Sequence, residues 1–247
     1  MYDKVRFLPA GDQSLLMEFG NEISPEINFK IRNTVKAIDD SQIDAIWELI
    51  PTYRSIQIFY DPLKIDYHAL VASLDELVSS IETGELDSLR IVEIPTVYGG
   101  EFGPDIEFVA KNSGLDVDEV IRIHSSQDYL IYMLGFTPGF SYLGGMDERI
   151  ATPRLESPRT KIPAGSTGIA GSQTGIYPID SPGGWQLIGR TPLALYNPQD
   201  DPPVLLKAGD YVRFVPIDEI EYARLKDLVD RDEYEVNVII DEVVGDE

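Results

Sequence analysis

The sequence predicts an α+β protein in which a small two-layer α/β domain precedes a β-barrel or β-sandwich. Near the N-terminus, short alternating strands flank two segments whose apolar residues repeat at helical spacing. Further on, eleven of the twenty glycines fall between Gly135 and Gly189, which divides the chain into short strands joined by tight turns. A length of 247 residues is enough for two domains of ordinary size.

The N-terminal domain is expected over residues 1–85. Ser24 is placed to cap a helix that begins at Pro25, and Asp66 to cap a second one, because both side chains can accept hydrogen bonds from the first turn. Four strands are expected, at Val5–Leu8, Ser14–Phe19, Ile43–Ile50 and Ser55–Tyr60. Two helices on one face of a small antiparallel sheet is the simplest arrangement of these elements.

The second domain is expected over residues 86–240, followed by an acidic tail at 241–247. Asp116 and Glu119 form a capping pair for a short helix that ends near His124. A strand at Asp128–Leu134 follows, and the segment Gly209–Pro216 alternates as a strand does. The linker between the domains is expected at residues 83–88.

The composition excludes several classes of function. The chain has 43 acidic and 20 basic residues, a formal charge of −23, and a field of that sign repels nucleic acids and anionic membranes. It has no cysteine, which excludes disulfides, thiolate metal sites and thiol nucleophiles. No apolar run approaches a membrane span, and the first residues lack the apolar core of a signal peptide. We therefore expect a soluble, cytoplasmic protein.

The charge is distributed unevenly. Between Gly135 and Pro192 there are four acidic and five basic residues, so this window carries +1 and the rest of the chain −24. A basic island on an acidic protein suits an anionic ligand such as a carboxylate or a phosphate. The alternative is that the bases pair with acids elsewhere in the fold.

Arg154, Arg159 and Lys161 are the centre of this island, on chain stiffened by three prolines. Proline lowers the freedom that is lost on binding, so the two guanidinium groups would be held ready for an anion. Gly165 and Ser166 follow and could cradle an oxyanion, or could form an ordinary turn between strands. These residues, with Arg190 further along, are the candidates for substrate or phosphate binding.

Two glycine-rich segments are candidates for a loop or barrel mouth around a ligand. The first contains Phe136, Pro138, Gly139 and Phe140, and the second contains Gly183, Gly184 and Trp185. Such loops can bring backbone N–H groups close to a ligand, and Trp185 could stack on a flat one. Tight barrel corners explain the first segment almost as well, and plugging the barrel mouth is the more common use of a large aromatic residue such as Trp185.

His124 is the candidate for general acid catalysis or anion binding. At the end of a helix its cationic form would be favoured by the helix dipole. A histidine at such a position often only caps carbonyl groups. The second histidine, His68, lies far away in the sequence, so no zinc site is expected and no metal is predicted.

Three segments of the basic island resemble a known family: GFTPGFSYLGG, PRLESPRTKIPAGS and YPIDSPGGWQLIGRTP. The family groups the B subunit of bacterial 5-oxoprolinase, the sporulation-kinase inhibitor KipI and allophanate hydrolase subunit 1. The resemblance extends to the N-terminal half through GDQSLLMEFG and IPTYRSIQIFYDP. It implies that the second domain is a cyclophilin-like β-barrel, and it adds Gln173 and Tyr177 to the candidate site residues.

The resemblance also implies function and partners. It implies membership of an ATP-dependent enzyme complex that opens the cyclic amide 5-oxo-L-proline to L-glutamate, with this chain inactive alone. The partners would be a homologous barrel protein, the C subunit, similar to KipA and allophanate hydrolase subunit 2, and a larger A subunit. Two other functions stay open, inhibition of a histidine kinase and a role in urea or allophanate metabolism. The chain has no standard nucleotide-binding motif, so the sequence does not place ATP.

Overall fold

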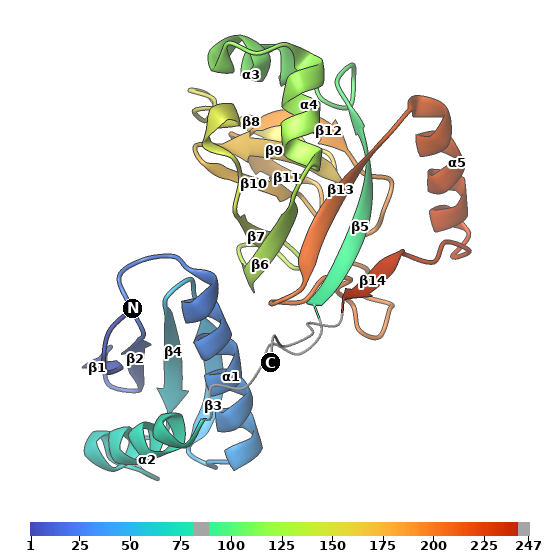
Figure 1. The fold of residues 1–247 in the computed structure, drawn as a ribbon. Coiled ribbons are helices and arrows are strands. Elements are labelled where there is room, and N and C mark those ends of the chain that lie inside the picture. Colours follow the sequence, from blue (N-terminus) through green and yellow to red (C-terminus); the bar gives the residue numbers. More distant parts are fainter. Residues whose placement is uncertain (82–88, 242–247) are drawn as a thin grey trace. The chain divides into compact units, whose positions relative to one another are not determined.

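The computed structural model describes residues 1–81 and 89–241. These residues form two compact units, one on each side of the gap at 82–88, and each is described separately (Figure 1). The predicted linker and all but the first residue of the predicted acidic tail lie outside the described residues, so the domain boundaries stay predictions. No helix within the described ranges is long and apolar enough to cross a membrane.

The first unit is a four-stranded antiparallel sheet with two helices. Its sheet has the order β1-β2-β4-β3, and its core joins the helices to one sheet face through residues such as Leu15, Ile31, Ile58 and Leu74. The elements are β1 (Arg6–Pro9), β2 (Ser14–Glu18), α1 (Pro25–Ser41), β3 (Ile46–Pro51), β4 (Ser55–Tyr60) and α2 (Tyr67–Ser80). This is the predicted two-layer arrangement.

Both helices begin at the predicted caps. The Ser24 side chain accepts a hydrogen bond from Ile27 N, and the Asp66 side chain accepts bonds from His68 N and Ala69 N. These bonds satisfy N–H groups that have no partner inside the helix.

The second unit is a curved sheet that nearly closes into a barrel. The strand order is β10-β9-β12-β5-β13-β6-β7, with β14 also paired to β5, and the end strands β7 and β10 lie against each other. The strands are β5 (Leu89–Tyr98), β6 (Asp128–Leu134), β7 (Ser141–Gly144), β9 (Ser166–Ala170), β10 (Gln173–Ile176), β12 (Gln186–Arg190), β13 (Tyr211–Ile217) and β14 (Val238–Asp241). The structure confirms the predicted α+β class and its barrel.

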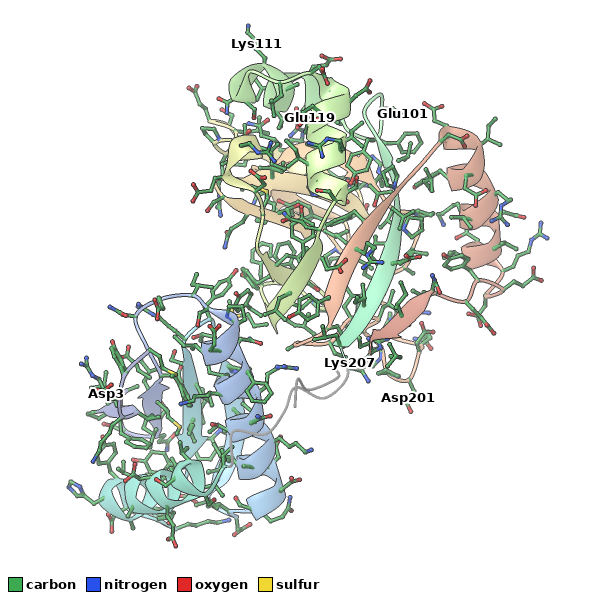
Figure 2. All side chains as sticks on the ribbon, viewed as in Figure 1. Asp3, Glu101, Lys111, Glu119, Asp201 and Lys207 are labelled. Carbon is green, nitrogen blue, oxygen red and sulfur yellow. The ribbon has the colours of Figure 1, made fainter. Side chains whose placement is uncertain are left out.

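Helices and a small ribbon complete the second unit (Figure 1). They are α3 (Ile106–Ser113), α4 (Val117–Ser125), the 3₁₀ turn η1 (Glu148–Ile150), α5 (Glu219–Asp230), and a two-stranded ribbon of β8 (Arg159–Ile162) and β11 (Ser181–Gly183). Charged side chains such as Lys111 and Asp201 point away from this unit (Figure 2).

The barrel wall separates two apolar clusters. Ile169 and Ile176 pack into the main core of the barrel, whereas their neighbours Ala170 and Tyr177 belong to a smaller cluster with Trp185. Successive side chains of a strand point to opposite faces, so β9 and β10 carry one cluster on each face. The candidate site is built on the smaller cluster.

Candidate functional site

A pocket of about 230 Å³ opens beside β10 and β11. Its lining combines five aromatic rings, one cation, one primary amide and a Pro-Gly-Gly segment at the end of β11. The lining residues are Phe136, Phe140, Tyr142, Arg154, Gln173, Tyr177, Pro182, Gly183, Gly184 and Trp185. Eight of these ten were singled out from the sequence, although the segments that carry them are far apart in the chain.

The aromatic wall is rigid. Phe140, Tyr177 and Trp185 are each at most 7% exposed, and their rings meet edge to face at centroid distances of 5.8–6.1 Å. Edge-to-face pairs at this spacing are favourable beyond their buried area. The pocket therefore keeps its shape without a ligand and presents flat apolar walls.

Glycines beneath the wall allow this packing. A Cβ at Gly175 would lie 3.1 Å from the Trp185 ring, and a Cβ at Gly183 would lie 2.4 Å from the Tyr177 hydroxyl. The indole and the phenol therefore occupy space that other residues would fill with side chains. A Cβ at Gly184 would meet nothing closer than 3.6 Å.

Phe136 forms the exposed rim of the pocket. It has a φ of 67° and lies at the centre of a three-residue turn, in which Thr137 N donates to Gly135 O at 2.8 Å. A left-handed conformation at a non-glycine residue costs roughly 1–3 kcal/mol and is concentrated at functional sites. The ring is 70% exposed and touches Phe140 edge to face. Phe136 thus combines backbone strain with an exposed ring at the rim of the pocket.

Arg154 is the one cation among the described residues that line the pocket. Of the five bases in the basic island, Arg149 pairs with Asp147, Arg159 with Asp105 and Lys161 with Asp180. Arg154 is exposed and makes no ion pair with any residue in the described ranges. The basic island thus presents one guanidinium to a ligand in the pocket.

Arg159 has a structural role instead. Its guanidinium donates to Asp105 Oδ1 at 2.7 Å and to the Trp185 carbonyl at 3.3 Å. The other Asp105 oxygen accepts from Leu187 N at 2.6 Å, so one largely buried carboxylate joins the ribbon to β12. The predicted pair of free arginines is therefore not what the structure shows, because Arg159 is held by an acid 54 residues away in the chain.

The remaining candidates for anion binding lie outside the pocket lining. Lys161 makes a highly exposed pair with Asp180, an interaction of little energetic weight. Arg190 lies over the Phe102 ring, 5.5 Å from its centroid. Both have partners of their own in the second unit.

Gly165 and Ser166 belong to the barrel wall. Gly165 N donates to Tyr177 O at 2.7 Å and Ser166 N donates to Pro163 O at 3.2 Å, so neither N–H is available to an oxyanion. Ser166 is completely buried. In the aromatic loop, Pro138 is exposed, and Gly139 packs against Tyr196.

His124 is buried in the barrel core and does not line the pocket. Burial lowers its pKa to about 3, so the imidazole is neutral near pH 7. The expectation that the helix dipole would favour the cation is wrong. A helix end contributes up to about 2 kcal/mol, whereas full burial can shift a pKa by about 3–5 units, equivalent to roughly 4–7 kcal/mol.

The sequence did not single out Tyr142 and Pro182 as site residues. Both lie within motifs that were recognised. Tyr142 in β7 makes an edge-to-face contact at 5.2 Å with Phe140, two residues earlier, as side chains two residues apart in extended chain can. Within the described residues, no group of three or more His, Cys, Asp and Glu residues could hold a metal ion.

Comparison with known proteins identifies the family. The model of the carboxyltransferase domain, subdomain C and D, matches residues 5–206. The B subunit of 5-oxoprolinase from Bacillus subtilis is 47% identical over 227 residues, which cover 88% of this chain and 95% of that protein. The corresponding B subunit of 5-oxoprolinase from Escherichia coli O157:H7 is 55% identical over 198 residues, which cover 79% of this chain and 90% of that protein.

A solved structure is also similar to this chain in sequence and in fold. A protein from Pyrococcus horikoshii is 53% identical and superposes with a TM-score of 0.53, covering 88% of this chain and 100% of that one. The resemblance predicted from the sequence motifs is confirmed. This chain belongs to the carboxyltransferase domain family, subdomain C and D, together with the two bacterial B subunits.

Proposed function

We propose that this chain is the B subunit of an ATP-dependent 5-oxoprolinase, which opens 5-oxo-L-proline to L-glutamate with partner subunits. The observation that carries the proposal is identity of 47–55% with two proteins of that name over nearly their whole length. The pocket supports it independently, because its chemistry suits a small cyclic amide that bears one carboxylate.

The substrate has three features that the pocket can recognise. Arg154 can hold the carboxylate through two parallel N–H···O bonds. The Gln173 amide can pair with the lactam, since each group has an N–H donor beside a carbonyl acceptor. The apolar ring carbons can pack against the aromatic wall that contains Tyr177 and Trp185. Burial raises the pKa of Tyr177, so its hydroxyl keeps its proton and can donate to the ligand.

ATP does not fit this pocket. A triphosphate carries several negative charges, whereas the described lining offers one guanidinium and no carboxylate to hold a magnesium ion. We therefore place the nucleotide on a partner protein. The partners proposed from the family resemblance are a homologous barrel protein, the C subunit, and a larger A subunit, in the cytoplasm. This chain would hold the lactam while the partners couple ring opening to ATP.

Reconstitution tests the function. 5-oxo-L-proline-dependent phosphate release should be absent with this chain alone and with any pair of subunits, and should appear when this chain is mixed with both the C and the A subunits. Glutamate should form in step with phosphate. A complete, well-folded mixture that hydrolyses no ATP in response to 5-oxo-L-proline would contradict the proposal. Binding to a histidine kinase would then become the function to examine.

A further inference from the structure

His124 joins two parts of the barrel through its side chain. Nδ1 is 2.8 Å from the hydroxyl of Tyr98, at the end of β5, and Nε2 is 2.7 Å from the hydroxyl of Thr174 in β10. The Thr174 hydroxyl in turn donates to the carbonyl of Gly168 in β9 at 3.2 Å. His124 and Thr174 are both essentially buried. We call this chain of hydrogen bonds, Tyr98–His124–Thr174–Gly168, the barrel relay.

The hydrogen bonds of the barrel relay are all donated in the same direction, from Tyr98 towards Gly168. Thr174 has a single hydroxyl proton, and it is donated to Gly168 O, so Thr174 accepts from His124 Nε2–H. Nδ1 of the neutral ring is then an acceptor, and it accepts a hydrogen bond from the Tyr98 hydroxyl. Burial holds the pKa of Tyr98 well above its usual value, so that proton is always present. Every polar side-chain group in the relay is thus satisfied.

The barrel relay holds β10 from behind the pocket. Thr174 points into the barrel core, and its neighbour Gln173, on the opposite face of the strand, lines the pocket. Gly175, next on that face, lies under the Trp185 ring. A displacement of Thr174 would therefore move both the pocket amide and the floor beneath the indole.

We propose that His124 is a positioning residue, which acts through Thr174 to set the place of the Gln173 amide in the pocket. This inference rests on the proposed function. Apolar residues could fill the same space in the core, but apolar contacts have no preferred direction. A hydrogen-bond network in which every group is satisfied holds the strand in one defined position. The role is orientation of the lactam-binding wall, and no proton leaves His124 during the reaction.

The chain offers a matched control for this inference. Thr167 in β9 is also buried, and its hydroxyl makes no hydrogen bond within the structure. In the ladder between β9 and β10, Thr167 lies opposite Ile176. Ile176 is two residues from Thr174 in β10, so the two threonines are close together in the barrel wall. Thr→Val removes a hydroxyl and keeps the volume in both positions, but only at Thr174 does it break the barrel relay.

Steady-state kinetics of the reconstituted enzyme test the proposal. We expect Thr174→Val to raise KM for 5-oxo-L-proline by about 10-fold with a smaller effect on kcat, because a shift of the binding wall weakens productive binding. Thr174→Ser should restore KM, and Thr167→Val should leave it unchanged. In a Gln173→Ala background, Thr174→Val should have a clearly smaller effect, because only the floor beneath the indole is then left to move. Equal effects of the two valine variants, or an undiminished effect without the Gln173 amide, would overturn the inference.

Amide hydrogen exchange of the chain alone gives an answer that does not depend on activity. Thr174→Val should speed exchange in residues 173–177 by about 10-fold, and Thr167→Val should not. If the exchange result holds but the reconstituted mixture is inactive, the proposed function fails and the relay's hold on β10 stands. Unchanged exchange in Thr174→Val would overturn the positioning role even in an active enzyme.

Discussion

Arg154→Ala is expected to lower kcat/KM for 5-oxo-L-proline by about 100-fold, the equivalent of roughly 2.8 kcal/mol. Arg154 is the one guanidinium in the pocket lining that has no acidic partner among the described residues, so no other cation there can replace it. Most of the loss should appear in KM, because the carboxylate takes no part in ring opening and is bound equally before and during it. Kinetics of the reconstituted complex measure both constants.

Two further variants separate charge from geometry at this position. Arg154→Lys keeps the charge but loses the two-pronged contact, so it should recover only part of the affinity. Arg149→Ala removes an exposed arginine that pairs with Asp147 outside the pocket, and should change neither constant. The melting temperature of Arg154→Ala should equal that of the parent protein. Wild-type kinetics in Arg154→Ala would exclude the pocket as the carboxylate site.

Arg159 is unsuitable as a partner in a double variant. Its replacement would leave the largely buried carboxylate of Asp105 unpaired where the ribbon meets β12. Breaking a buried pair on one side costs several kcal/mol, so the loss of activity would reflect damage to the fold. The Arg154 variant alone therefore isolates the contribution of substrate binding.

Gly183→Ala is expected to lower stability and raise KM much more than Gly184→Ala does, although both glycines line the pocket. The new Cβ at 183 would lie 2.4 Å from the Tyr177 hydroxyl and 2.8 Å from Ile162 Cδ1, and both of these side chains are buried. The Tyr177 ring must then shift into the pocket or the ribbon must open. We expect a loss of about 1–3 kcal/mol of stability and at least a roughly tenfold rise in KM.

Gly184→Ala is the matched control. Its Cβ would meet atoms only at ordinary contact distances of 3.6–3.7 Å, so both stability and KM should stay close to the parent values. Thermal unfolding and kinetics of the two variants measure the contrast. A Gly183→Ala enzyme with the parent KM, despite a displaced Tyr177, would mean that this wall does not contact the substrate.

Elements set by local chemistry could be predicted from the sequence. Asp116 was predicted to cap α4, and its side chain accepts from Glu119 N. The strand Asp128–Leu134 was predicted with the bounds that the structure has. Glycine density between residues 135 and 189 indicated the many short strands of the barrel. In each case the determining atoms lie within a few residues of one another.

Features that depend on distant contacts could not be predicted. Strand β13 pairs in parallel with β5 although the two are far apart in the chain, and no local pattern specifies that pairing. The same holds for Asp105, which neutralises Arg159, and for the barrel core, which buries His124. The sequence motifs therefore indicated the segments that line the pocket, but only the fold separates Arg154 in the pocket from bases that have structural partners.

A structure of the assembled complex with 5-oxo-L-proline bound is the most direct test of the proposed site. We expect the ligand in the pocket, with its carboxylate within hydrogen-bonding distance of Arg154, its lactam beside Gln173 and its ring against the wall that contains Tyr177 and Trp185. A ligand bound entirely on another protein of the complex, with this pocket unchanged and empty, would contradict the proposed role of the pocket.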